Sequence, residues 1–155
     1  MAKTFNTEGN IYPNSESSIL LKQLETALFE SFGTDTICDN QAHGWNPKDP
    51  ANNQCAVAAL VVNRLLPQFD QIVNDNRLGI DHYWGKNSIT GEEIDFTRCQ
   101  HQLKGIVPQI RRTRRARELL EGEKSIKART TERFEILLRR TQNHLKSLER
   151  NISKH

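Results

Sequence analysis

The 155-residue sequence contains no run of eighteen apolar residues, so it predicts no transmembrane helix. Its first eight residues lack the apolar stretch of a secretory signal peptide, and we expect none. It has no Walker or Rossmann glycine motif, internal repeat or low-complexity segment. With 35% hydrophobic and 26% charged residues, the chain is expected to form one polar, cytoplasmic domain with no membrane contact.

Cysteine is also scarce. The only three, Cys38, Cys55 and Cys99, are odd in number and follow no paired pattern, which favours free thiols in a reducing cytosol over a disulfide framework. A zinc site built from Cys38, His43, Cys99 and His101 is an alternative. Its spacings, Cys-x4-His and Cys-x-His, match no usual structural zinc pair, so we expect no metal.

Charge is distributed unevenly along the chain, whose overall net charge is +3. Residues 109–155 contain fourteen Lys or Arg and six Asp or Glu, a net of +8. The remaining residues contain eight basic and thirteen acidic side chains, a net of −5. This contrast predicts either docking of the basic part onto the acidic part or a basic face for an anionic partner.

Five arginines occur within seven residues of the basic region. They are Arg111, Arg112, Arg114, Arg115 and Arg117. Such a cluster can contact phosphates, and it predicts a weak anion-binding site. A charge run is more often the solvated face of a helix, and there is little aromatic interleaving for stacking on bases.

Apolar periodicity and turn residues predict a mixture of helices and short strands. Helices are expected at residues 16–32, 53–65, 110–120 and 131–148, and strands at residues 71–73, 80–85 and 92–96. The turn composition of residues 87–91 joins the last two strands in a hairpin, with Gly85 and Gly91 interpreted as turn glycines. We expect one domain, 1–155, with a catalytic core in 1–108 and a basic helical extension in 109–155.

A cysteine nucleophile is predicted at Cys55, in the first turn of the apolar helix expected at 53–65. A helix N-terminus and a nearby imidazolium both stabilise a thiolate, and backbone N–H groups at that end can hold an oxyanion. Gln54 is a candidate for a further oxyanion donor, and Trp45 and Asn46 are candidates to line the cleft. The alternative is a buried structural cysteine.

His82 and Asp95 are the predicted partners of this thiol. The hairpin places them on neighbouring strands, although its register does not follow from the sequence. His82 is expected to take the thiol proton, and Asp95 to accept the other N–H of the imidazole. Tyr83 and Trp84 are expected to form a wall that limits water. The alternatives are a core or surface histidine and a solvent-facing aspartate.

A longer string of residues carries a resemblance to a known family. It reads Trp-Asn-Pro-x-x-Pro-x-x-x-Gln-Cys-Ala-Val-x-Ala-Leu-Val-Val, then His-Tyr-Trp, then Gly-x-Glu-Ile-Asp-x-Thr. The string resembles the YunG family of small bacterial proteins, firmly over residues 17–100 and loosely over 111–138. The chain differs in its longer basic C-terminal helix, which we interpret as an added binding element. The matching residues are Trp45, Asn46, Pro47, Pro50, Gln54, Cys55, Ala56, Val57, Ala59, Leu60, Val61, Val62, His82, Tyr83, Trp84, Gly91, Glu93, Ile94, Asp95 and Thr97.

The order of Cys55, His82 and Asp95 is also similar to that of papain-like and transglutaminase-like proteins and arylamine acetyltransferases. We expect an α+β fold in which a central helix carrying the cysteine packs on a short antiparallel sheet, with helices flanking it. The expected chemistry is acyl transfer: amide or thioester hydrolysis, deamidation or transglutaminase-type transfer. The substrate is an unidentified small molecule or protein, and no metal or organic cofactor is required.

Two alternatives to an enzyme remain open. One is a binding module that uses the basic C-terminal helices to contact nucleic acid or an acidic protein. The other is a homo-oligomer whose subunits meet along a helical stripe of Phe134, Leu138, Leu145 and Leu148.

Overall fold

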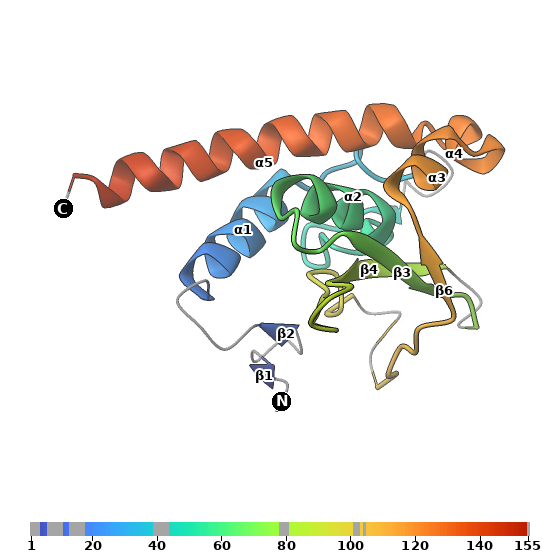
Figure 1. Ribbon diagram of the computed structural model, residues 1–155. Coiled ribbons are helices and arrows are strands. Elements are labelled where there is room, and N and C mark those ends of the chain that lie inside the picture. Colours follow the sequence, from blue (N-terminus) through green and yellow to red (C-terminus); the bar gives the residue numbers. More distant parts are fainter. Residues whose placement is uncertain are drawn as a thin grey trace.

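The computed structural model has an α+β architecture, as the sequence predicts (Figure 1). It describes residues 4–5, 11–12, 18–38, 44–77, 81–100, 103 and 105–154. The helices are α1 (Ser18–Ser31), α2 (Cys55–Leu65), α3 (Ala116–Glu121), α4 (Glu123–Lys127) and α5 (Thr130–Ile152). The strands are β1 (Thr4–Phe5), β2 (Ile11–Tyr12), β3 (Gln71–Asp75), β4 (His82–Lys86), β5 (Glu93–Ile94) and β6 (Arg112–Arg114).

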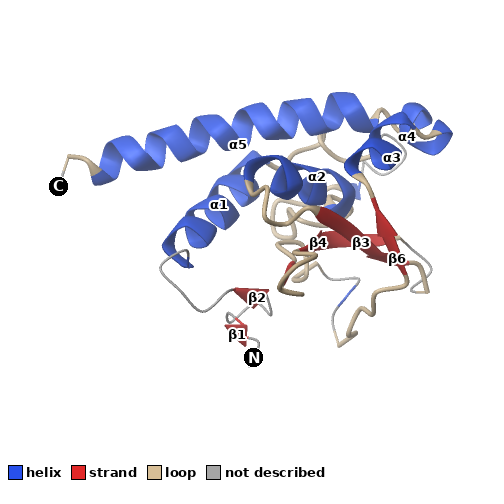
Figure 2. Ribbon diagram, viewed as in Figure 1, coloured by secondary structure: helices blue, strands red, loops and turns tan. Residues whose placement is uncertain are grey.

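Four strands form the main sheet, in the order β5-β4-β3-β6, with every neighbouring pair antiparallel. Strands β4, β3 and β6 are labelled in Figure 2. Gly85 on β4 lies opposite Ile94 on β5, and Asp75 at the end of β3 lies opposite His82 at the start of β4. Strands β1 and β2 form a separate two-stranded pair. The register of β4 against β5 fixes which side chains meet at the candidate site.

The predicted hairpin between β4 and β5 is confirmed. Its turn is closed by the N–H of Asn87, which donates to the carbonyl oxygen of Glu92 at 2.8 Å. The Asn87 side-chain oxygen accepts the N–H groups of Ile89 and Thr90. Gly91 has φ +75°, a conformation that glycine adopts without steric cost.

Helix α2 is central because its surface is apolar almost all round. Residues 57–62 are all buried, and Pro67 stops the helix soon afterwards. The helix packs on β4, where a Cβ on Gly85 would lie 2.9 Å from Ile94 Cγ2 and 3.2 Å from Val62 Cγ1. The interpretation of Gly85 as a turn glycine is therefore wrong: it lies inside β4 and allows helix and sheet to approach closely.

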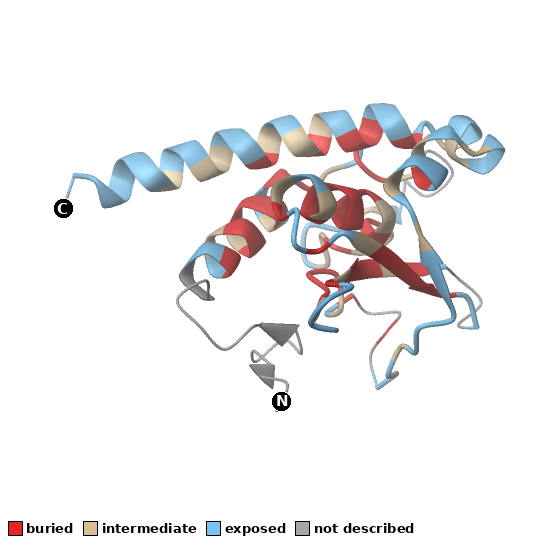
Figure 3. Cartoon of the chain, in the orientation of Figure 1, coloured by how far each residue is buried: buried red, intermediate tan, exposed pale blue. Residues whose placement is uncertain are grey.

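Helix α5 lies across α1 and α2 and continues past them toward the C-terminus (Figure 1). Its buried residues follow one stripe in the first half, where Figure 3 shows red segments facing the body of the protein. Phe134 is buried, and Leu138 and Leu145 pack against the core, so three residues of the proposed oligomer stripe are used within the chain. Although α5 is long, no helix in the described residues is both long and apolar enough to cross a membrane.

Polar contacts attach the basic helix to the acidic part of the chain. Arg140 forms a two-pronged ion pair with Asp35, whose Oδ1 accepts from Nη1 at 2.7 Å. His144 lies 3.1 Å from Glu30 of α1. The buried Arg133 donates to the carbonyl oxygen of Thr36. Part of the charge contrast along the sequence therefore serves docking within the chain.

The helix predicted at residues 110–120 is wrong in its first half. Residues 112–114 form β6, which pairs with β3 so that Ile72 lies opposite Arg114, and the helix begins only at Ala116. The N–H of Arg111 donates to the carbonyl oxygen of Asn74 at 2.8 Å. The open edge of β3 supplies backbone hydrogen bonds that override the helical propensity of arginine. The region expected to be a helical extension thus begins with a strand of the main sheet.

Asp75 holds the chain where it returns to form β6. Its carboxylate is fully buried and accepts from the Nε, Nη2 and backbone N–H of Arg77 and from the N–H of Gln109. The hydrogen bond from Arg77 is the strongest influence on the pKa of Asp75, which lies well below its usual range although burial alone would raise it. The ionised carboxylate therefore stabilises this junction.

Candidate active site

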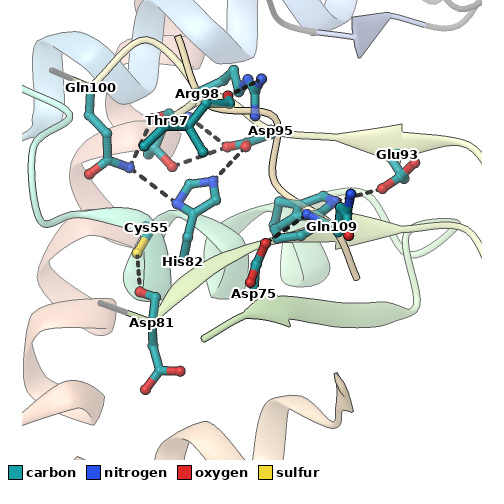
Figure 4. A network of polar contacts seen from close by, with 12 residues as sticks. Cys55, Asp75, Asp81, His82, Glu93, Asp95, Thr97, Arg98, Gln100 and Gln109 are labelled. Carbon is teal, nitrogen blue, oxygen red and sulfur yellow. Dashed lines mark hydrogen bonds and ion pairs between the residues drawn. The ribbon is translucent and has the colours of Figure 1, made fainter. Parts of the chain in front are cut away.

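Cys55 is the first residue of α2, at the N-terminal end where the sequence predicted it. Gln54 precedes it at the N-cap position, and the Gln54 side chain makes no capping hydrogen bond. The thiol is 8% exposed, and it donates a hydrogen bond to the carbonyl oxygen of Asp81 at 3.4 Å (Figure 4). Cys55 therefore meets the sheet just before β4 begins.

His82 and Asp95 form a buried hydrogen-bonded pair, with Nε2 of the imidazole 2.6 Å from Oδ2 of the carboxylate (Figure 4). The hairpin register explains this contact. Since Gly85 is opposite Ile94, continuing the pairing by one residue places Asp95 opposite Trp84. His82 is then the diagonal neighbour of Asp95 on the same face, because alternate residues of a strand share a face.

The Asp95 carboxylate is held from both sides. Its Oδ1 accepts the backbone N–H and the hydroxyl of Thr97, both at 3.1 Å, while Oδ2 faces His82. Both Asp95 and Thr97 are buried. A buried carboxylate needs such partners, since burying an unpaired charge is costly. The set fixes the carboxylate and, through it, the orientation of the imidazole.

Two opposing influences act on the pKa of His82. Burial alone would lower it, because the charged imidazolium loses its hydration. The charge and hydrogen bond of Asp95, together with Cys55, raise the pKa above its ordinary value, and they prevail. Cys55 thus lies within electrostatic reach of the ring.

Trp84 covers the imidazole. The rings of Trp84 and His82 stack at 5.5 Å between centroids with an interplanar angle of 24°. The indole N–H donates to Glu93 at 2.9 Å, and the residue is 5% exposed. Trp84 therefore shields one side of the His82–Asp95 pair from water.

Tyr83 points to the other face of β4, where it packs against the core beside α2. Burial, with smaller effects of Asp81 and Cys55, raises the pKa of Tyr83 to about 12, while Arg114 and Arg112 act to lower it. Its hydroxyl thus lies within electrostatic reach of both the thiol and the arginines of β6.

A surface hollow of about 250 Å³ lies beside Tyr83. It carries two basic and two acidic side chains, so its charge alone selects no ligand of one sign. The lining residues are Tyr83, Arg114, Glu118, Leu119, Gly122, Glu123, Lys124 and Ser125.

Gln100 is a site residue that sequence reasoning missed. It is 1% exposed, and its amide nitrogen lies 3.2 Å from Nδ1 of His82 (Figure 4). The same amide donates to the carbonyl oxygen of Thr97 at 2.9 Å and accepts the backbone N–H of Asn53 at 3.3 Å. Gln100 was expected to begin a helical region, but it closes a turn that starts at residue 96. No periodicity or motif marks such a residue.

The remaining predicted cleft residues lie outside this contact network. Gln54 is fully buried, and its amide donates to the carbonyl oxygen of Gly33 at 3.2 Å, so it packs in the core. Asn46 is exposed and accepts the N–H of Lys48, an interaction that shapes its own loop. Trp45 is half-buried, and its indole N–H has no hydrogen-bond partner among the described residues.

The arginine run divides into paired and unpaired members. Arg114 lies 3.8 Å from Glu118, and Arg117 lies 3.2 Å from Glu121. The exposed side chains of Arg111, Arg112 and Arg115 pair with no carboxylate in the part of the chain that the structure describes. Most of the unpaired charge therefore lies on or next to β6.

A metal centre does not emerge among the described residues, where no three His, Cys, Asp or Glu side chains gather as ligands. The alternative zinc set is only partly described, because His43 and His101 lie outside those residues. Cys38 and Cys99 form no disulfide among the described residues, and Cys99 is exposed.

Comparison with known proteins identifies the family. The family model described as YunG protein matches residues 20–146, so the chain belongs to the YunG family. The match reaches far into α5, and the part of that helix up to residue 146 is consequently a family feature rather than an added element. No curated protein matches the chain, and no solved structure does.

Proposed function

We propose that this YunG-family protein is a cysteine-dependent acyl hydrolase or acyltransferase in which Cys55, His82 and Asp95 act as a triad. The observation that carries the proposal is the buried contact of 2.6 Å between His82 and Asp95, next to a thiol at a helix N-terminus. A carboxylate, an imidazole and a thiol in this order have the roles of orienter, base and nucleophile. The arrangement is papain-like or transglutaminase-like by analogy.

The first chemical step assigns one role to each ring nitrogen. Because Nε2 of His82 is hydrogen-bonded to Asp95, Nδ1 is the nitrogen that takes the proton of the Cys55 thiol. The thiolate then attacks the carbonyl carbon of the substrate, and the carbonyl oxygen becomes an oxyanion. The imidazolium returns its proton to the leaving amine or thiol as the tetrahedral intermediate collapses to a Cys55 thioester.

The second step releases the acyl group. Water, or an amine in a transfer reaction, attacks the thioester while Nδ1 of His82 takes its proton, and that proton returns to the sulfur as Cys55 leaves. Backbone N–H groups at the start of α2 stabilise both oxyanions, because the first N–H groups of a helix have no partner within the helix. Asp95 stabilises the imidazolium present in each step.

A direct test is formation of the acyl-enzyme. The protein is incubated with activated acyl esters and thioesters, and intact mass spectrometry with peptide mapping locates the adduct. We expect the adduct on Cys55, although Cys99 is the more exposed thiol. Cys99→Ser is the matched control and should acylate normally, whereas Cys55→Ser and His82→Ala should not. Acylation confined to Cys99 and indifferent to His82→Ala would contradict the proposal.

A second candidate function is binding of an anionic partner, nucleic acid or acidic protein, at β6. It is favoured by Arg111, Arg112 and Arg115, three exposed guanidinium groups without a carboxylate partner in the described residues. β6 is also an edge strand of the sheet. An edge strand presents open backbone groups, although charged side chains there also serve to prevent unwanted pairing.

Salt-dependent binding tests this candidate. A triple change of Arg111, Arg112 and Arg115 to glutamine should weaken binding to single-stranded DNA, or to an acidic polypeptide, and reduce its dependence on salt. The matched control removes three exposed cations from α5 instead, through Arg139→Gln, Lys146→Gln and Arg150→Gln. Equal effects of the two sets would reveal attraction by net charge only and exclude a site at β6.

A further inference from the structure

The amide of Gln100 can adopt only one orientation in its surroundings. Its Oε1 accepts the N–H of Asn53 and its Nε2 donates to the carbonyl oxygen of Thr97. Rotating the amide by half a turn would set N–H against N–H and oxygen against oxygen. The orientation is thus fixed by two backbone groups, and the Gln100 N–H that faces His82 is a donor.

This donor defines the state of the imidazole in the structure. Nδ1 of His82, 3.2 Å from Gln100 Nε2, must present its lone pair, so the ring proton lies on Nε2 and points to Asp95. The Cys55 thiol donates to the carbonyl oxygen of Asp81 and lies within electrostatic reach of the ring. The contact with Gln100 belongs to a neutral imidazole.

Proton transfer from Cys55 to Nδ1 reverses this pattern. The new N–H on Nδ1 would face the N–H of Gln100, and the thiolate would face the carbonyl oxygen of Asp81. Two donors facing each other in a buried site lose one hydrogen bond and leave another group unsatisfied. The ion pair can form only when the Gln100 amide withdraws from Nδ1.

We propose that Gln100 is a positioning residue that competes with Cys55 for Nδ1 of His82 and thereby opposes formation of the thiolate–imidazolium pair. Gln100 also joins the base to the turn before the nucleophile, through Asn53, which has a left-handed backbone with φ 59°. A change in that turn therefore alters the hydrogen bond between Gln100 and His82. The proposal depends on the roles of Cys55 and His82 given under the proposed function.

The test measures alkylation of Cys55 by iodoacetamide against pH, in a Cys38→Ser, Cys99→Ser background where Cys55 is the sole thiol. Gln100→Met removes the competing donor and should raise the alkylation rate at pH 6 roughly threefold to tenfold, the worth of one net hydrogen bond. Gln100→Glu retains an acceptor for Asn53, can accept the N–H of Nδ1, and should raise the rate at least as much.

Gln54→Met is the matched control. Gln54 is also a fully buried glutamine and adjoins Cys55, but its amide donates to the backbone carbonyl oxygen of Gly33. Gln54→Met should lower the stability by a similar amount to Gln100→Met and leave the pH profile of Cys55 alkylation unchanged. A purely structural role of Gln100 would give both methionine variants the same profile.

Nitrogen NMR of labelled histidine gives a readout that does not depend on variants folding. In the parent protein, neutral His82 should carry its proton on Nε2, and a proton on Nδ1 would overturn the proposal. An unchanged or slower rate in both Gln100 variants would also overturn it, while the triad would survive if His82→Ala slows alkylation. If His82→Ala changes nothing, the triad itself fails.

Discussion

The two edges of the main sheet carry charge in opposite ways. At the β5 edge, Asp95 is buried, and its two oxygens are satisfied by His82 and Thr97. At the β6 edge, Arg112 is exposed and has no carboxylate partner in the described residues. Buried charges are retained only where specific partners offset the loss of hydration, whereas exposed charges need none. The first edge carries the proposed proton transfer, and the second carries the proposed surface for an anion.

A similar division runs through the basic C-terminal third. On α5, Arg140 and His144 meet Asp35 and Glu30, so these cations attach the helix to the acidic part of the chain. On and next to β6, Arg111, Arg112 and Arg115 are exposed. Net charge along the sequence therefore does not distinguish internal docking from a surface for a partner, but the pairing of individual side chains does.

The largest effect should follow from breaking the buried edge. Asp95→Ala leaves His82 Nε2 and the donors of Thr97 without an acceptor, and should lower the free energy of unfolding by about 3–5 kcal/mol. Arg112→Gln on the opposite edge should change it by no more than about 0.5 kcal/mol. Urea denaturation measures both. Similar losses in the two variants would contradict the contrast between the edges.

The close approach of α2 to the hairpin predicts the next effect. Gly85→Ala places a methyl group 2.9 Å from Ile94 Cγ2, so one element must move, at a cost of about 1–3 kcal/mol. Gly44→Ala is the control, since nothing lies within 4 Å of a Cβ there and the change should stay within about 0.5 kcal/mol. A shift of the thermal midpoint in Gly44→Ala alone would refute this packing.

Protonation of Asp75 at low pH should destabilise the β6 edge of the sheet. The pKa of this carboxyl is lowered from 3.8 in the folded protein, so its contribution to stability is complete above about pH 4 and is lost as the pH falls toward the folded value. Asp75→Asn should lower stability at neutral pH and flatten its decline below pH 4. In the Asp75→Asn variant, hydrogen exchange at the Arg112 and Arg114 amides should also be faster than in the parent. Identical pH profiles for variant and parent would exclude this role.

The smallest effect is expected for the ion pair between α5 and the loop after α1. Arg140→Gln removes a partly exposed pair with Asp35 and should cost no more than about 1 kcal/mol, a loss that added salt should diminish. Denaturation at low and high salt measures it. A larger, salt-independent loss would show that α5 depends on this contact more than on Phe134 and Leu137 in the core.

The sequence was informative where local rules decide the structure. Turn residues between two short strands predicted the hairpin, and that hairpin brought His82 and Asp95 together. A continuous apolar run predicted the buried helix of Cys55. These features depend on neighbours along the chain, so their signals are local.

Long-range contacts decided what the sequence could not predict. β6 forms because β3 offers an open edge, with Val73 lying opposite Thr113. Helical propensity alone, which ignores such a distant partner, predicts a helix for the arginines. Gln100 reaches His82 through an irregular turn, and Gln54 turns into the core toward Gly33. A polar residue shows no sequence sign of which backbone group it will bind.

The pH dependence of Cys55 alkylation tests the central claim most directly. Parent, His82→Ala and Asp95→Asn are compared in the Cys38→Ser, Cys99→Ser background. The account predicts rapid reaction below pH 7 in the parent, a loss of at least about tenfold in His82→Ala, and a smaller loss in Asp95→Asn. A rate that rises only near pH 8.5, as for an ordinary thiol, and is equal in all three proteins would contradict the triad.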